Sequence, residues 1–221
     1  MRVISVVEEK MEWEDVDKVV AKHVEPTPRS TGIHLSGILR ALQIEAGLLK
    51  VREDGKWVGD TEDDDEVFPL RMAMGMAWEA WVAARYDSMI WQPGEIETDG
   101  IFGTPDGLTH LQDVPEIEMT EAEEREGQIL VEEFKLTWMS YRERIQDVTK
   151  WIWQGMGYCK MWRTTYCRFN ILYVNGNYKN RPFTPMYMRY LVEFTPLEIE
   201  RFWKMVVKNK SKAKAEGLVS S

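Results

Sequence analysis

The chain has 221 residues, of which 44% are hydrophobic, and its formal net charge is −9. This size suits one domain with a sizeable core, and the lack of a long apolar run or signal-like N-terminus leads us to expect a cytoplasmic protein with no membrane contact. Two cysteines are too few for a disulfide framework or a four-cysteine metal site.

The charge is divided unevenly along the chain. Residues 1–134 carry 12 Lys and Arg against 31 Asp and Glu, whereas residues 135–221 carry 16 against 6. The negative average argues against a nucleic-acid partner, but such an asymmetry is also a feature of polyanion-binding proteins. A basic tail that serves only solubility is the alternative.

The N-terminal part of the chain predicts one strand and two well-marked helices. Residues 1–25 suggest a short strand followed by a short helix. Ser36 has the residue type and position of an N-cap for a helix that runs to about Leu49. A loop or hairpin at 50–66 leads to Pro69, which we expect to open a long apolar helix.

Strand patterns dominate the middle of the chain. Residues 89–98 and 100–110 read as two strands joined by a Thr-Asp-Gly turn. The acidic stretch 112–127 is an insert, and the next strand is predicted at 129–137.

The C-terminal part alternates again. A helix is predicted at 141–162, then strands at 166–176 and 186–194. Thr195 is expected to cap a basic helix and tail, residues 196–221, which starts with proline. This alternation predicts an α/β sandwich in a single domain.

The segment ILVEEFKLT (129–137) places charged residues in what is otherwise a core strand. Alternation puts Glu133 and Lys135 on one face and Phe134 on the other. The pair is either a solvated outer face with one ion pair or part of a functional site.

Two further carboxylates stand out. Glu79 is the only charged residue between Arg71 and Arg85, and an apolar helix buries such a group at a cost unless it is paired. An exposed polar stripe is the alternative. Asp106 ends a strand in Gly-Thr-Pro-Asp-Gly, where a plain hairpin turn is the alternative.

Together these residues favour a metal site where the sheet splays. Asp106, Glu133 and Glu79, with the backbone carbonyl of Phe134, would make an all-oxygen set. Such a set suits Mg²⁺ or Mn²⁺ rather than zinc. Lys135 would lie beside the metal-bound water and stabilise charge on a phosphorane-like transition state.

Pro105-Asp106 and Glu133-Phe134-Lys135 resemble the PD-(D/E)xK nuclease superfamily. Gln154-Gly-Met-Gly-Tyr158 is similar to the Q-x-x-x-Y motif of its RecB-like and λ-exonuclease-like members, with both side chains on one helix face. Glu79 matches the family's additional metal-ligand position. The resemblance covers about residues 29–160. It implies an α/β fold with a restriction-endonuclease-like core, a central mixed sheet flanked by helices, within about residues 29–195.

The resemblance also implies contacts to DNA. Arg29 and Ser36 resemble the element that holds a 5′-phosphate in λ-type exonucleases; a loop residue and a simple helix cap are the alternatives. In the basic second half, Lys150, Arg163 and Arg168 are expected to contact phosphates, and the acidic loops are expected to point away from the DNA.

Two features depart from the family. The gap from Asp106 to Glu133 is long and holds the acidic insert. The four cysteines of the iron–sulfur cluster in some RecB-like relatives are absent, so Cys159 and Cys167 lead us to expect no such cluster.

The resemblance implies a Mg²⁺-dependent DNA exonuclease of phage or bacterial recombination or DNA processing, in the cytoplasm of a bacterium or an infected host cell. A structure-specific endonuclease on the same core is an alternative, and so is a non-catalytic interaction module whose acidic insert contacts a protein. DNA is the expected partner, a recombination or single-strand-annealing protein is a candidate partner, and an oligomer is compatible with the resemblance.

Overall fold

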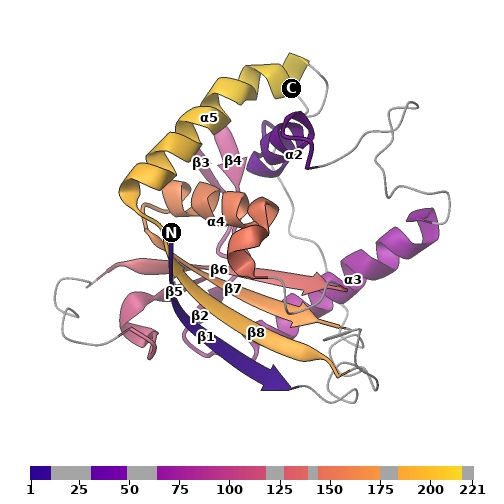
Figure 1. Cartoon of the computed structure of the whole chain (residues 1–221), viewed down its shortest axis with the longest axis vertical. Helices are drawn as coiled ribbons and strands as arrows, with labels where there is room; N and C mark the ends of the chain where they lie inside the picture. The colour runs from indigo at the N-terminus through magenta and orange to yellow at the C-terminus, as the bar shows by residue number, and fades with distance from the viewer. Residues whose placement is uncertain (11–30, 49–63, 118–126, 139–143, 175–183, 216–221) are drawn as a thin grey trace.

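The structure is a computed structural model that describes residues 1–10, 31–48, 64–117, 127–138, 144–174 and 184–215 (Figure 1). In these residues one six-stranded mixed sheet is accompanied by four α-helices. The expected α/β class with a central mixed sheet flanked by helices is therefore confirmed. The predicted helix before residue 25 and most of the predicted loop at 50–66 lie outside the described residues.

The sheet has its four long strands side by side and its two short strands together at one edge. Its order is β1 (Arg2–Lys10), β8 (Met186–Glu193), β7 (Tyr166–Tyr173), β6 (Ile129–Thr137), β5 (Gly107–His110) and β2 (Met89–Trp91). β6 and β7 are parallel, and the other neighbours are antiparallel. A parallel pair needs a crossover, and the helix α4 (Thr149–Met161) supplies it.

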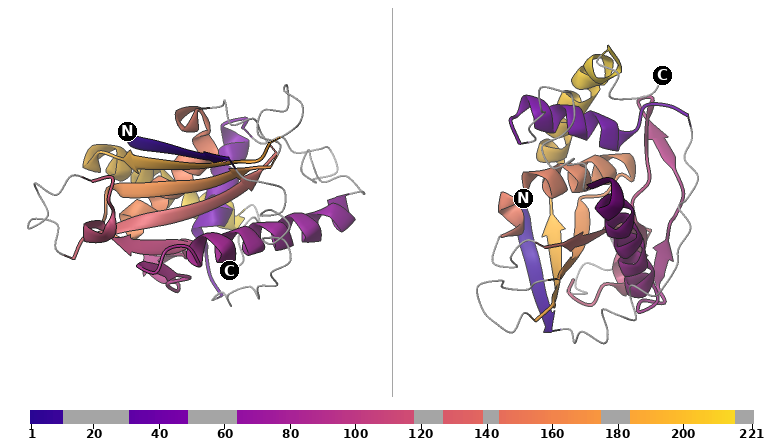
Figure 2. Two further views of the ribbon diagram at one scale, coloured as in Figure 1. Left: turned by 90° about the horizontal axis from the view of Figure 1, so that it is seen from below. Right: turned by 90° about the vertical axis from the view of Figure 1, so that its right-hand side faces the viewer.

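Three helices lie together on one face of the sheet (Figures 1 and 2): α4, α2 (Leu35–Glu45) and α5 (Pro196–Ala215). They bury the apolar side chains of β6, β7 and β8 that point to this face, such as Val131 and Phe169. A Cβ on Gly157 of α4 would come within 2.5 Å of the Leu35 side chain, so the absence of a side chain lets α4 and α2 approach closely.

The other face carries α3 (Asp64–Ala83), which lies apart from those three helices (Figure 2). Trp78 and Val82 of α3 pack against Phe134 of β6 and Leu172 of β7. The two faces of β6 therefore have different coverings: α3 lies over Phe134, and α4 over Val131.

The predicted N-cap of α2 is wrong. His34 is the N-cap, with extended backbone and no side-chain capping bond, and Ser36 lies within the first turn. Tertiary contacts explain the shift: residue 34 bridges to Phe102, whose backbone N–H donates to the Ile33 carbonyl, and His34 lies 3.3 Å from Glu95. These contacts hold residue 34 extended, so the helix begins after it.

Other helix ends also differ from the prediction. α2 ends at Glu45 rather than about Leu49, because Gly47 adopts a left-handed conformation with φ 69°. α3 begins at Asp64 rather than at Pro69, which is consistent with the preference of acidic residues for a helix N-terminus.

α4 begins at Thr149, after a short 3-10 turn at Ile145–Asp147, rather than at residue 141. The cap of α5 is confirmed: the Glu198 carboxylate accepts the Thr195 backbone N–H at 2.8 Å, and the Thr195 hydroxyl accepts the Glu198 N–H at 3.2 Å. No helix in the described part of the chain is long and apolar enough to cross a membrane.

The strands predicted at 89–98 and 100–110 are each divided in two. Positive φ at Gln92 and Gly94 separates β2 from β3 (Ile96–Thr98). β3 pairs with β4 (Ile101–Gly103) through the predicted turn, where Asp99 and Gly100 both have positive φ. β5 follows after Thr104-Pro105-Asp106, and this second break creates the candidate site.

Candidate functional site

The candidate site lies where β5 separates from β6. Gly107 pairs with Glu132, and Asp106 is the next residue outward. Its Oδ2 accepts the backbone N–H of Phe134 at 2.7 Å, so a carboxylate takes the place that a strand carbonyl would occupy. Asp106 is thereby fixed at the point of divergence, as its sequence position predicted.

Glu133 and Lys135 point to the same face of β6, and Asp106 lies beside them. Lys135 Nζ donates to Glu133 Oε2 at 2.6 Å and lies 3.8 Å from Asp106 Oδ2. Two acidic groups therefore share one ammonium group. The structure thus brings together the three residues that carry the resemblance to the nuclease superfamily.

Glu133 is in an unfavourable place for a charge. Its side chain is 0% exposed, and its Oε1 has no hydrogen-bond partner among the described residues. Burial raises the pKa of this carboxyl to about 8; the Lys135 charge opposes the shift and the Asp106 charge adds to it. Without another cation, most of the Glu133 population is protonated at neutral pH.

Lys135 has the opposite response. Burial lowers its pKa, but the negative charges of Glu133 and Asp106 outweigh burial and raise the pKa above its ordinary value. Lys135 therefore stays an ammonium group at physiological pH, and it can donate hydrogen bonds but cannot accept a proton.

These oxygens partly fit the divalent cation that the resemblance implies. A buried carboxylate oxygen that has no hydrogen-bond partner among the described residues, beside a second carboxylate, is the kind of hard donor that Mg²⁺ or Mn²⁺ prefers. Within the described part of the chain, however, no three His, Cys, Asp or Glu side chains are grouped to hold a metal ion. A cation here would be held by Asp106, Glu133, a backbone carbonyl such as that of Phe134, and water.

Glu79 does not join Asp106 and Glu133 in a three-carboxylate group. It is half-buried on α3, next to Trp78, and Trp78 packs on the Phe134 side of the sheet. Its predicted role as a metal ligand stays a prediction.

Gln154 and Tyr158 approach the site from α4. Tyr158 is buried and hydrogen bonds with Gln154, and its pKa is raised, first by burial and then by the charges of Glu133 and Asp106. Tyr158 is therefore close enough to both carboxylates for their charges to affect its pKa.

A small pocket lies between the N-terminus of α2 and Tyr158. It is lined by His34, Leu35, Ser36, Phe102, Gly103, Thr104 and Tyr158. Ser36 is thus at the pocket even though it is not the helix cap. Arg29, its predicted companion in phosphate binding, lies outside the described residues.

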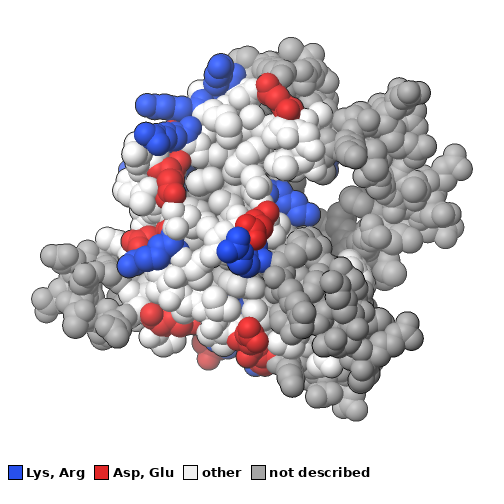
Figure 3. Space-filling view, viewed as in Figure 1, with Lys and Arg blue, Asp and Glu red and all other residues white. Residues whose placement is uncertain are grey.

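Two of the three predicted phosphate contacts are on the surface. Lys150 is exposed at the start of α4. Arg163 is exposed beyond the end of α4, and the neighbouring Thr164 hydroxyl donates to the carbonyl of Ile129 at the start of β6. Arg163 therefore lies toward the opposite end of β6 from Lys135. Figure 3 shows further Lys and Arg over the region of α5, where Arg201, Lys204 and Lys208 are exposed.

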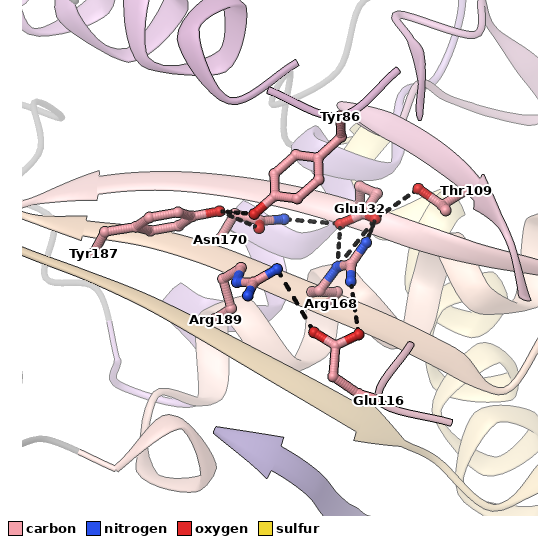
Figure 4. A network of polar contacts seen from close by, with 8 residues as sticks. All are labelled: Tyr86, Thr109, Glu116, Glu132, Arg168, Asn170, Tyr187 and Arg189. Carbon is pink, nitrogen blue, oxygen red and sulfur yellow. Dashed lines mark hydrogen bonds and ion pairs between the residues drawn. The ribbon is translucent and has the colours of Figure 1, made fainter. Parts of the chain in front are cut away.

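The third, Arg168, is not placed to contact phosphate. Its side chain is 4% exposed and forms an ion pair with Glu132 on the face of the sheet opposite Glu133. Its Nη1 also lies 3.5 Å from Glu116, a residue of the acidic insert (Figure 4). The prediction failed because the position of a strand residue depends on the register with its neighbour, in which Glu132 lies beside Arg168.

This buried ion pair belongs to a larger polar network that sequence reasoning missed (Figure 4). Its members are Tyr86, Thr109, Glu116, Glu132, Arg168, Asn170, Tyr187 and Arg189. The available signal was the presence of Glu132, Arg168 and Asn170 in otherwise apolar strands.

Comparisons with known proteins do not assign a family. No family model matches the sequence, and no curated protein matches it. A solved structure described as "Crystal structure of SSO0001" shares 10% identity with this chain at a TM-score of 0.44, over 87% of this chain and 83% of the other. This likeness is too distant to carry a functional argument.

Proposed function

We propose that the protein is a metal-dependent DNA nuclease that hydrolyses phosphodiester bonds. The observation that carries this proposal is the buried Glu133 carboxylate, which has one oxygen without a hydrogen-bond partner in the part of the chain that the structure describes, and which lies with Asp106 beside Lys135. A purely structural ion pair would not leave a buried carboxylate oxygen without a hydrogen-bond partner among the described residues.

Each residue of the cluster has a role in this reaction. Asp106 and Glu133 would hold Mg²⁺ or Mn²⁺, which supplies Lewis-acid polarisation of the phosphate and lowers the pKa of a bound water. Lys135 remains protonated, so it orients the attacking water and stabilises negative charge on the phosphate oxygens. The hydrogen-bonded Gln154 and Tyr158 form the adjoining α4 wall.

Action at DNA ends is the favoured mode. The pocket at the N-terminus of α2 includes Ser36 and borders Tyr158, so a phosphate held there would lie beside the wall of the cluster. The resemblance of Arg29 and Ser36 in the sequence to the 5′-phosphate element of λ-type exonucleases supports an exonuclease. A cytoplasmic location and a recombination or annealing partner belong to the same proposal.

Cleavage of end-labelled linear duplex and of covalently closed circles, each with Mg²⁺ and with excess chelator, tests the proposal. We expect linear DNA to be degraded with Mg²⁺ and closed circles to persist. Glu133→Gln should abolish cleavage, whereas Glu200→Gln, an exposed surface change, should not. Full cleavage in chelator would refute the metal mechanism, and equal attack on circles would favour the endonuclease alternative.

Recognition of the DNA end is tested by comparing two kinds of 5′ end. Linear duplexes with 5′-phosphate ends should be degraded faster than those with 5′-hydroxyl ends, and Arg29→Ala should remove the difference while keeping metal-dependent cleavage. Equal rates on both ends in the unaltered protein would leave Ser36 with a structural role.

A further inference from the structure

The Glu132 carboxylate connects three neighbouring strands immediately behind the candidate site. Its Oε1 accepts from the Thr109 hydroxyl of β5 at 2.7 Å, and both oxygens accept from Arg168 of β7. Its Oε2 also accepts from the Asn170 amide of β7 at 2.8 Å. Glu132, Thr109 and Asn170 are each 2% exposed or less, so these bonds are made away from water.

The position of this carboxylate along β6 links it to the cluster. Glu132 is adjacent to Glu133, and its cross-strand neighbour Gly107 is adjacent to Asp106. The Thr109–Glu132 bond therefore holds β5 to β6 beside the last strand pair before the two strands diverge. The two strands also lie close together at Gly107, because a Cβ on this residue would lie only 3.3 Å from the Glu132 Cβ.

The bond from Thr109 lies on the opposite face of the sheet from Lys135. It therefore cannot act by contact with a cation at the cluster. It can act only through the backbone, by fixing the distance between β5 and β6 next to Asp106 and Glu133.

We propose that Thr109 and Glu132 are positioning residues, which set the separation of the Asp106 and Glu133 carboxylates and thereby the affinity of the site for a divalent cation. This inference rests on the proposed metal-dependent function. Groups that support metal ligands from outside commonly change metal affinity by about 10- to 100-fold when they are removed.

The network offers a matched control on its other side. Tyr187 donates its hydroxyl to Asn170 Oδ1 at 2.9 Å, and this bond holds β8 to β7 without touching β5. Thr109→Val and Tyr187→Phe each remove one buried hydroxyl from the same network. Each should lower stability, but only Thr109→Val loosens β5, the strand that Asp106 directly precedes.

Calorimetric titration of the full-length protein with Mn²⁺, in the absence of DNA, measures the affinity of the site for the cation. We expect Thr109→Val to weaken Mn²⁺ binding by about 10-fold, the lower end of the usual range for such support. Thr109→Ser, which restores the hydroxyl, should recover the affinity, and Tyr187→Phe should stay within about 2-fold of the unaltered protein, because it leaves the β5–β6 bond in place. Thermal unfolding of each variant confirms that the folded form is being titrated.

Unchanged Mn²⁺ affinity in Thr109→Val, or an equal loss in Tyr187→Phe, would overturn the positioning role and leave the proposed nuclease intact. If the unaltered protein bound no Mn²⁺, both the proposed function and this inference would fall.

Discussion

Replacing Glu133 with glutamine should stabilise the metal-free protein at alkaline pH but not at acid pH. The reason is that the folded chain holds the Glu133 proton far more tightly than the unfolded chain. The pKa of this carboxyl is raised from 4.5 to about 8, first by burial, and Lys135 only partly offsets the effect.

The direction in which the free energy of unfolding changes with pH follows from the release of the Glu133 proton on unfolding. Below pH 4.5 both states are protonated at Glu133, and the charge contributes nothing. Between pH 4.5 and about 8 only the folded state keeps the proton, so rising pH favours the unfolded state. Above pH 8 the full cost is present, and the difference between the two pKa values corresponds to roughly 5 kcal/mol. Lys135 stays protonated across this range and does not alter the trend.

The assay is urea unfolding in excess chelator at several values between pH 5 and pH 9. The free energy of unfolding of Glu133→Gln minus that of the unaltered protein should rise with pH by about 3–5 kcal/mol and level off above pH 8. Other titrating groups are common to both proteins and cancel in the difference. A difference that does not change with pH would show that Glu133 is not held protonated by burial, and the physical basis of the site would fail.

Four further outcomes follow from the same contacts. Mn²⁺ affinity should rise about tenfold per pH unit between pH 6 and pH 7.5, because the cation competes with the Glu133 proton, and calorimetry at several pH values measures it. Arg168→Met should cost about 3–5 kcal/mol in urea unfolding because Glu132 would stay buried without its cationic partner, and it should leave the salt dependence of DNA binding unchanged. Thr195→Ala should cost about 1 kcal/mol, measured in the same way, through loss of the α5 cap. Gly157→Ala should lower the melting temperature by forcing α4 away from Leu35.

The Glu133–Lys135 pair could be predicted from sequence because its geometry is local, whereas its meeting with Asp106 depends on the β5–β6 pairing and was expected from the family resemblance. Side chains alternate along a strand, so Glu133 and Lys135 had to share a face. Pro105 and Gly107 beside Asp106 indicated a turn at the end of a strand, which a plain hairpin would also have explained. The α/β class likewise followed from the order of helix and strand patterns, which require no knowledge of distant contacts.

The features that sequence reasoning missed depend on contacts between distant segments. The role of Arg168 depends on the β6–β7 register, and a one-residue shift would send its side chain to the other face. The start of α2 depends on the bridge between residue 34 and Phe102, which overrides the capping preference of Ser36. Neither contact leaves a pattern in one sequence.

Glu132 and Glu133 are adjacent and equally buried, but they differ in their hydrogen-bond partners. Glu132 receives bonds from Thr109, Arg168 and Asn170, so its charge is compensated in place. Glu133 shares Lys135 with Asp106, and the cluster formed by these three residues has two acidic groups for one basic group. A fold that can surround one glutamate with donors has the means to surround its neighbour. That it leaves Glu133 incompletely paired, at the point where two strands separate, favours a site that is completed by a cation over one that serves stability.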